Sequence, residues 1–165
     1  MEYCVGDNVV VPGCGVGLLE AREEMQMEGV GRLDVYRVNL GESAGTTWIP
    51  VAAATTDRIR PVMSSDAVPA TWEVMSAQEA PEKRATWNRR QRRYNELISS
   101  GAPQDLAALA GELAAVQAVK TLSFGEVRLL EKARKLLVDE IAVALGQVAE
   151  EVDARFEARV MAFGA

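Results

Sequence analysis

Short runs of alternating apolar and polar residues fill the first 63 positions of the chain. Residues 9–11 form a β-branched run that Pro12 closes, and residues 16–20, 32–40 and 46–49 form three more. Short strands at this spacing, with glycine and proline between them, are typical of a small antiparallel barrel. The alternation slips by one position at Val35-Tyr36, which predicts a β-bulge in that strand.

Residues 64–165 carry a helical pattern, rich in alanine and leucine. Arg60-Pro61 predicts the boundary, because the residue before proline is disfavoured in a helix. Thr86 is a candidate cap for a helix over residues 87–99, and Pro69 is expected to disturb any helix started by residues 64–66. Further helices are predicted over residues 106–119, from the capping box of Ser123 and Glu126, and over residues 147–163. The stripe predicted to face the core consists of Leu130, Ala133, Leu137, Ile141 and Ala144 in one helix and of Val148, Val152, Phe156, Val160 and Phe163 in the last. The predicted fold class is α+β: an antiparallel β barrel in residues 1–63, then a compact all-helical domain in residues 64–165.

Composition excludes several kinds of chemistry. The chain has no histidine, only two cysteines (Cys4 and Cys14) and a net charge of −6. Imidazole catalysis and histidine metal sites are therefore absent, and the glycines of residues 13–17 match no nucleotide-binding motif. We predict no catalytic residue, metal or cofactor, and hence no enzyme. The sequence predicts neither a signal peptide nor a membrane span, and so a cytoplasmic protein.

A basic segment is the strongest functional signal. Residues 83–93 contain six basic and no acidic side chains. On a helix that begins near Thr86, Arg89, Arg92 and Arg93 share one face and Arg90 lies beside Arg93. Arginine binds phosphate in a fork, so nucleic acid is the favoured partner. The alternative is a solvated basic face balanced by the acidic C-terminal segment.

Two tryptophans have alternative roles that the pattern leaves open. Trp87 precedes the arginines and could act as an apolar wedge at a base step, or it could pack in the core with Tyr94 and Ile98. Trp48 lies in a strand that Pro50 ends. It could be exposed on an edge strand that accepts a partner's strand, or it could belong to the barrel core.

Taken together, these residues resemble the CarD/CdnL family of bacterial RNA polymerase-binding regulators. The resemblance covers nearly the whole chain through short motifs in a fixed order. They are Val5-Gly6-Asp7 with Val9-Val10, Pro12 and Gly15-Val16-Gly17; Ile49-Pro50-Val51; Arg60-Pro61-Val62-Met63; Trp87-Asn88-Arg89-Arg90; Leu122-Ser123-Phe124-Gly125-Glu126 with Arg128; and Ala133-Arg134-Lys135-Leu136-Leu137.

The resemblance implies a Tudor-like β domain that binds the polymerase β subunit and a helical domain that contacts promoter DNA and stabilises the opened promoter. It also implies that Trp87 is the wedge at the upstream edge of the bubble. The expected DNA-binding residues are Trp87, Arg89, Arg90, Arg92, Arg93 and Arg128. The expected polymerase-binding residues are Met25, Trp48, Ile49, Pro50 and Val51.

The chain departs from the family pattern at four positions. Met25, Gly111 and Val127 stand where relatives often carry a basic residue, and Trp48 stands where relatives have arginine or methionine. The expected protein is therefore a divergent family member or a paralogue. It is expected to be a monomer that is cytoplasmic and associated with the nucleoid. The alternative function is a protein-only adaptor whose helical domain binds another regulator rather than DNA.

Overall fold

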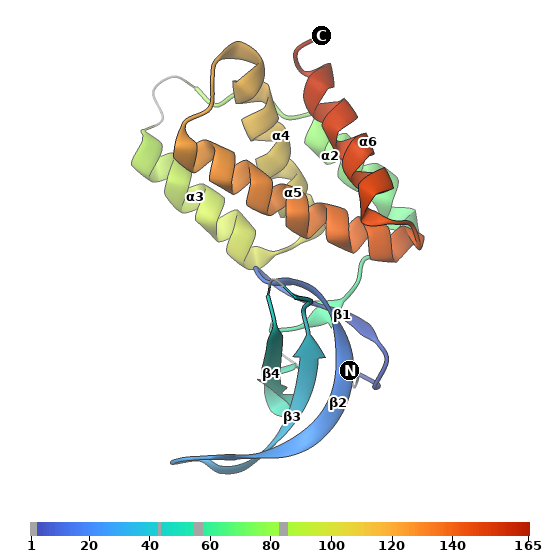
Figure 1. The fold of residues 1–165 in the computed structure, drawn as a ribbon. Helices are drawn as coiled ribbons and strands as arrows, with labels where there is room; N and C mark the ends of the chain where they lie inside the picture. The colour runs from blue at the N-terminus through green and yellow to red at the C-terminus, as the bar shows by residue number, and fades with distance from the viewer. Residues whose placement is uncertain (1–2, 43, 55–57, 83–85) are drawn as a thin grey trace. The chain divides into compact units, whose positions relative to one another are not determined.

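The chain divides into two compact units, which are described separately. The computed structural model describes residues 3–42, 44–54, 58–82 and 86–165. The first unit spans Met1–Val62 and the second Met63–Ala165. An antiparallel sheet forms the first unit and helices form the second (Figure 1), which confirms the predicted α+β class. No helix in the described ranges is long and apolar enough to cross a bilayer.

The first unit is a five-stranded sheet in the order β4-β3-β2-β1-β5, so β4 and β5 are its edge strands. All strand pairings among the described residues are antiparallel, and a short helix, α1, follows β4. The hairpin of β2 and β3 is the longest (Figure 1). The bounds are β1 Asn8–Val11, β2 Gly15–Met27, β3 Gly31–Asn39, β4 Thr46–Pro50, α1 Val51–Ala54 and β5 Arg60–Pro61.

One face of this sheet forms the core of the unit. Its buried side chains are Val9, Leu19, Tyr36, Val38, Ile49 and Ile59. Val35 is also buried, but successive side chains in a strand point to opposite faces, so it lies on the other side from Tyr36.

The predicted bulge lies on a different strand. β3 pairs with β2 without interruption through Val35 and Tyr36, and the register shifts instead between Leu19 and Ala21 of β2. The slip at Val35-Tyr36 therefore reflects a strand that is buried on both faces at that point. An apolar pair cannot distinguish that arrangement from an inserted residue.

The second unit contains a short 3-10 turn and five helices. Its elements are η1 Ser65–Ala67, α2 Val68–Ser76, α3 Trp87–Ser100, α4 Pro103–Val119, α5 Phe124–Leu145 and α6 Ala149–Ala162. The expectation that Pro69 disturbs an early helix was wrong. Pro69 lies in the first turn of α2, where its missing N–H would have had no helical acceptor.

The predicted helix limits in this unit follow from their caps. Thr86 caps α3 by accepting a hydrogen bond from the Arg89 N–H, and Gly101 ends the helix with a φ of 63°. The predicted capping box of Ser123 and Glu126 is present at the start of α5. Both helices that carry the candidate residues therefore begin where the sequence predicts.

Helix α4 is the centre of the helical unit and packs against α2, α3, α5 and α6. Leu109 and Leu113 of α4 are fully buried, and so are Leu137 and Ile141 of the predicted α5 stripe. Of the last predicted stripe, Val152 and Phe156 are buried, whereas Val148 precedes α6 and is exposed. A dense α4-centred core holds the N-terminal ends of α3 and α5 in place.

Candidate nucleic-acid and partner interfaces

The first turn of α3 presents Trp87 in a defined, half-buried position. The capping hydrogen bond of Thr86 fixes the start of the helix, and Trp87 is its first residue. The indole packs against the helical core but remains partly exposed. The indole therefore contacts the helical core, as one of the two alternatives predicts, and part of it stays accessible. Its role as a wedge stays a prediction.

The indole rests on the start of α5. An added Cβ on Gly125 would lie 3.0 Å from Cζ2 and 3.5 Å from Cη2 of Trp87, so the six-membered ring directly covers this glycine. The guanidinium carbon of Arg90 lies 5.7 Å from the centroid of the Trp87 ring. Arg90 of α3 and Gly125 of α5 therefore form the surface that contacts the indole, called the Trp87 seat.

Arg90 is largely buried and held by partners within the helical unit. Its Nη2 donates to Glu126 Oε2 at 2.9 Å and to Tyr94 Oη at 3.1 Å. The Arg90 side chain is 12% exposed and that of Glu126 only 3%. This pairing explains how a charged residue can lie on the same helix face as Tyr94 and Ile98, which are buried.

The pKa values around this pair favour the charged forms. Burial alone would raise the pKa of Glu126, but hydrogen bonds from the Ser123 backbone N–H and from Arg90 outweigh it and hold the pKa below its ordinary value. Burial would lower the pKa of Arg90, and its hydrogen bonds to Tyr94 and Glu126 raise it instead. The ion pair is thus fully charged at neutral pH.

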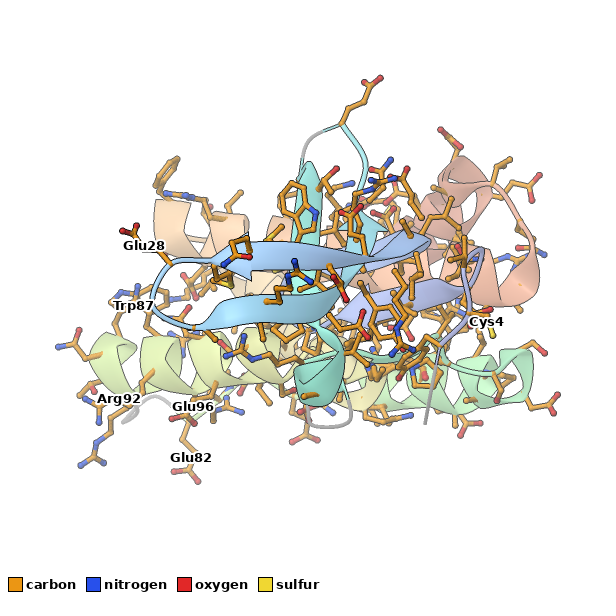
Figure 2. The ribbon with its side chains drawn as sticks, turned by 90° about the horizontal axis from the view of Figure 1, so that it is seen from below. Cys4, Glu28, Glu82, Trp87, Arg92 and Glu96 are labelled. Carbon is orange, nitrogen blue, oxygen red and sulfur yellow. The ribbon has the colours of Figure 1, made fainter. Side chains whose placement is uncertain are left out.

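The other three arginines of α3 differ from Arg90 in exposure and partners. Arg93 is about half exposed (51%) and forms an ion pair with the buried Glu112 of α4. Arg89 and Arg92 are exposed, and neither forms an ion pair within the described part of the chain. Figure 2 shows the Arg92 side chain extending away from the helix. Arg89 and Arg92 are therefore the α3 cations available to an anionic partner.

Phe124 is an exposed aromatic that the sequence reasoning did not select as a site residue. It is the first residue of α5, next to Gly125, and is 78% exposed. The guanidinium carbon of Arg128 lies 5.8 Å from the centroid of its ring. The capping box could have identified it, because it places Phe124 at the helix start and outside the buried stripe.

In the sheet unit, the predicted partner-binding residues separate onto different surfaces. Trp48 lies on edge strand β4, is 45% exposed, and donates from Nε1 to Glu23 Oε1 at 3.0 Å. Ile49 points into the sheet core, and Val51 begins α1. The remaining two residues of the predicted set, Met25 and Pro50, are half-buried, on β2 and at the end of β4. Trp48 is thus the one member of the set with a largely accessible side chain.

A polar network surrounds Trp48 on the outer face of the sheet. Arg37, its cross-strand neighbour, lies 3.2 Å from Glu23 and 3.4 Å from Glu20. Asn39 also donates to Glu20, at 2.9 Å. The hydrogen bond to Glu23 therefore fixes the Trp48 ring beside charged groups, and the ring is not buried by apolar side chains.

Comparison with known proteins identifies the family of the chain. The family model described as the CarD C-terminal domain matches residues 70–157, which is more than half of the chain. The chain belongs to the CarD family. Its matched region includes α3 and α5, and with them Trp87, the α3 arginines and the Gly125 seat.

A curated relative extends the likeness beyond the C-terminal domain of the CarD family. The chain is 26% identical over 150 residues to the Bacillus subtilis protein named "Putative transcription factor YdeB". The alignment covers 91% of this chain and 97% of the relative. Family and relative together support a transcription regulator rather than an enzyme. No group of side chains in the described residues could hold a metal ion.

Proposed function

We propose that this CarD-family protein binds the β subunit of RNA polymerase through its sheet unit and promoter DNA through its helical unit, and thereby stabilises the open complex. The observation that carries the proposal is Trp87, a half-buried indole at a helix start. It is flanked by Arg89 and Arg92, which form no ion pair with any residue that the structure describes. An aromatic wedge beside phosphate-binding arginines is the device by which minor-groove proteins unstack a base step.

The charge at the start of α3 supports an anionic partner. The first turn of this helix contains Arg89 and Arg90 and no acidic residue. Cations at a helix N-terminus oppose the helix dipole at a cost of about 0.3–1 kcal/mol each. Glu126 compensates Arg90, but no described carboxylate compensates Arg89. A phosphate at this position would relieve the cost and could also accept hydrogen bonds from Arg92.

Anchoring on polymerase explains how an anionic protein can act on DNA. The chain has a net charge of −6, so its intrinsic affinity for DNA is expected to be weak. Binding to polymerase by one unit makes the DNA contact of the other effectively intramolecular, which removes the need for high affinity. Edge strand β4, which contains Trp48, is the strand with which a strand of polymerase could pair.

Replacing Trp87 with alanine is expected to shorten the lifetime of the open promoter complex about tenfold. Stacking of a base on an aromatic ring contributes about 1–3 kcal/mol, and 1.4 kcal/mol corresponds to tenfold. The lifetime would be measured by challenging preformed complexes of polymerase and the full-length protein with a competitor DNA.

The matched control is Trp48→Ala, which removes the same side chain from the sheet unit. Trp48→Ala should weaken the capture of polymerase in a DNA-free pull-down, whereas Trp87→Ala should leave that capture unchanged. An unchanged lifetime with Trp87→Ala would refute the wedge. Equal loss of capture by both variants would refute the separation of the two binding functions.

The double variant Arg89→Ala, Arg92→Ala is expected to reduce the salt dependence of DNA binding. Each phosphate contact contributes a slope of about −0.9 to log K against log salt, so losing both should make the slope less steep by about 1.8. Fluorescence anisotropy with a fork-shaped duplex measures this. The control variant Lys132→Ala, Arg155→Ala removes two exposed charges from α5 and α6 and should leave the slope unchanged.

A second candidate function is a protein-only adaptor, favoured by exposed apolar residues where α4 ends and α5 begins. Val119 is 77% exposed and Val127 is 42% exposed. In that case Arg89 and Arg92 would meet an acidic protein surface. The salt slope on the fork duplex would then be the same for the double variant and its control, and charge reversal of Arg89 would release a protein partner.

A further inference from the structure

Gly125 lies under Trp87, and its backbone conformation does not require a glycine. It is the second residue of α5 and is not among the glycines with positive φ, so any residue could adopt its backbone conformation. Glycine inside a helix costs up to about 1 kcal/mol relative to alanine. Its benefit here is space, since a methyl group would lie 3.0 Å from Trp87 Cζ2, whereas carbon atoms pack best at about 3.5–4.0 Å.

The capping box at the start of α5 also holds Arg90, which lies beside the Trp87 ring. Glu126 uses Oε1 to accept from the Ser123 N–H at 3.0 Å and Oε2 to accept from Arg90 at 2.9 Å. Arg90 in turn lies beside the indole. The four-residue segment 123–126 therefore contains both the cap of α5 and the glycine that contacts the ring.

We propose that Gly125 is a positioning residue, which sets the depth at which Trp87 projects from the helical unit. A side chain at position 125 would displace the ring toward solvent by a few tenths of an ångström, because the added Cβ would lie 3.0 Å from Cζ2 and the core covers the indole only in part. The fold can tolerate this, since the indole is partly exposed. The consequence for DNA rests on the proposed function, whereas the displacement of the ring does not.

The test uses Gly125→Ala in the full-length chain with Trp48 changed to phenylalanine. Trp87 then dominates quenching by acrylamide, because Trp72 is buried. We expect a higher quenching constant for Trp87 and no loss in the free energy of unfolding. We also expect a roughly threefold weaker affinity for the fork duplex, because a displaced ring loses part of its stacking on the base. Loss of stability together with affinity would overturn the proposal, since it would indicate general damage to α5.

Combining Gly125→Ala with Trp87→Ala separates positioning from any other role of the glycine. If the glycine acts through the indole, Gly125→Ala has no effect on DNA affinity once the ring is gone. An equal loss of affinity in both backgrounds, or an unchanged quenching constant, overturns the proposal. If Trp87→Ala alone leaves the affinity unchanged, the proposed function fails, and the quenching constant still decides whether Gly125 positions the ring.

Discussion

Replacing Glu126 with alanine is expected to lower the free energy of unfolding of the helical unit by about 3 kcal/mol. Removing one partner of a buried ion pair typically costs about 3–5 kcal/mol, because the other charge stays buried and unpaired. Arg90 is 12% exposed, so water can solvate it only in part. The variant also loses the capping box, which stabilises the first turn of α5. Urea denaturation at pH 7, followed by circular dichroism, measures the change.

Two comparisons isolate the buried pair. Glu112→Ala also leaves an arginine without its partner, but Arg93 is half exposed and can be solvated, so we expect a smaller loss. The double variant Arg90→Met, Glu126→Ala should recover much of the stability, since it leaves no unpaired charge. Equal losses from Glu112→Ala and Glu126→Ala would contradict the burial described for Arg90.

The same pair should make stability depend on pH. The folded state lowers the pKa of Glu126, so its contribution is complete above the unfolded value of about 4 and is lost as the pH falls through the folded value. The difference in stability between the protein and the Glu126→Ala variant should therefore shrink in acid. A difference that stays constant down to pH 3 would exclude the carboxylate as its source.

Replacing Gly111 with alanine is expected to destabilise the helical unit by about 2 kcal/mol. A Cβ at this position would overlap the carbonyl oxygen of Met75, so α2 and α4 would have to move apart. Overpacking costs about 1–3 kcal/mol and occasionally more, which exceeds the gain of up to about 1 kcal/mol for alanine in a helix. Thermal or urea denaturation of the full chain would measure the loss.

Gly125→Ala is the matched comparison, because both glycines lie in helices and differ in what covers them. The backbone of Met75 lies against Gly111, whereas the Trp87 side chain, which can move, lies against Gly125. Gly111→Ala should lose stability and Gly125→Ala should not. A stabilising effect of Gly111→Ala would contradict the close approach of α2 and α4.

Gly111 also accounts for one departure from the family pattern. The family resemblance implies a position that is commonly basic, so the sequence alone suggests a missing surface charge. In the structure Gly111 is buried against α2, so the difference concerns helix packing. Val127, by contrast, is 42% exposed on α5, so a basic residue would be accessible there.

Local signals in the sequence determined the order of strands and helices and several of their limits. Thr86, Gly101 and the capping box of Ser123 and Glu126 act on backbone groups within a few residues, so their effect can be read without knowing the fold. The glycines that close the β1–β2 hairpin act in the same way: Gly13 and Gly15 have positive φ. The basic character of α3 was also evident, because it depends only on which residues the segment contains.

Only the tertiary structure decided which arginines are available. Arg90 and Arg93 find their carboxylates 36 and 19 residues away, on α5 and α4, and helical periodicity contains no information about such partners. The half-burial of Trp87 likewise depends on α5, and the exposure of Trp48 on the place of β4 at the sheet edge. Sequence neighbours fix the local backbone, whereas burial and charge pairing arise between segments that meet only when the chain folds.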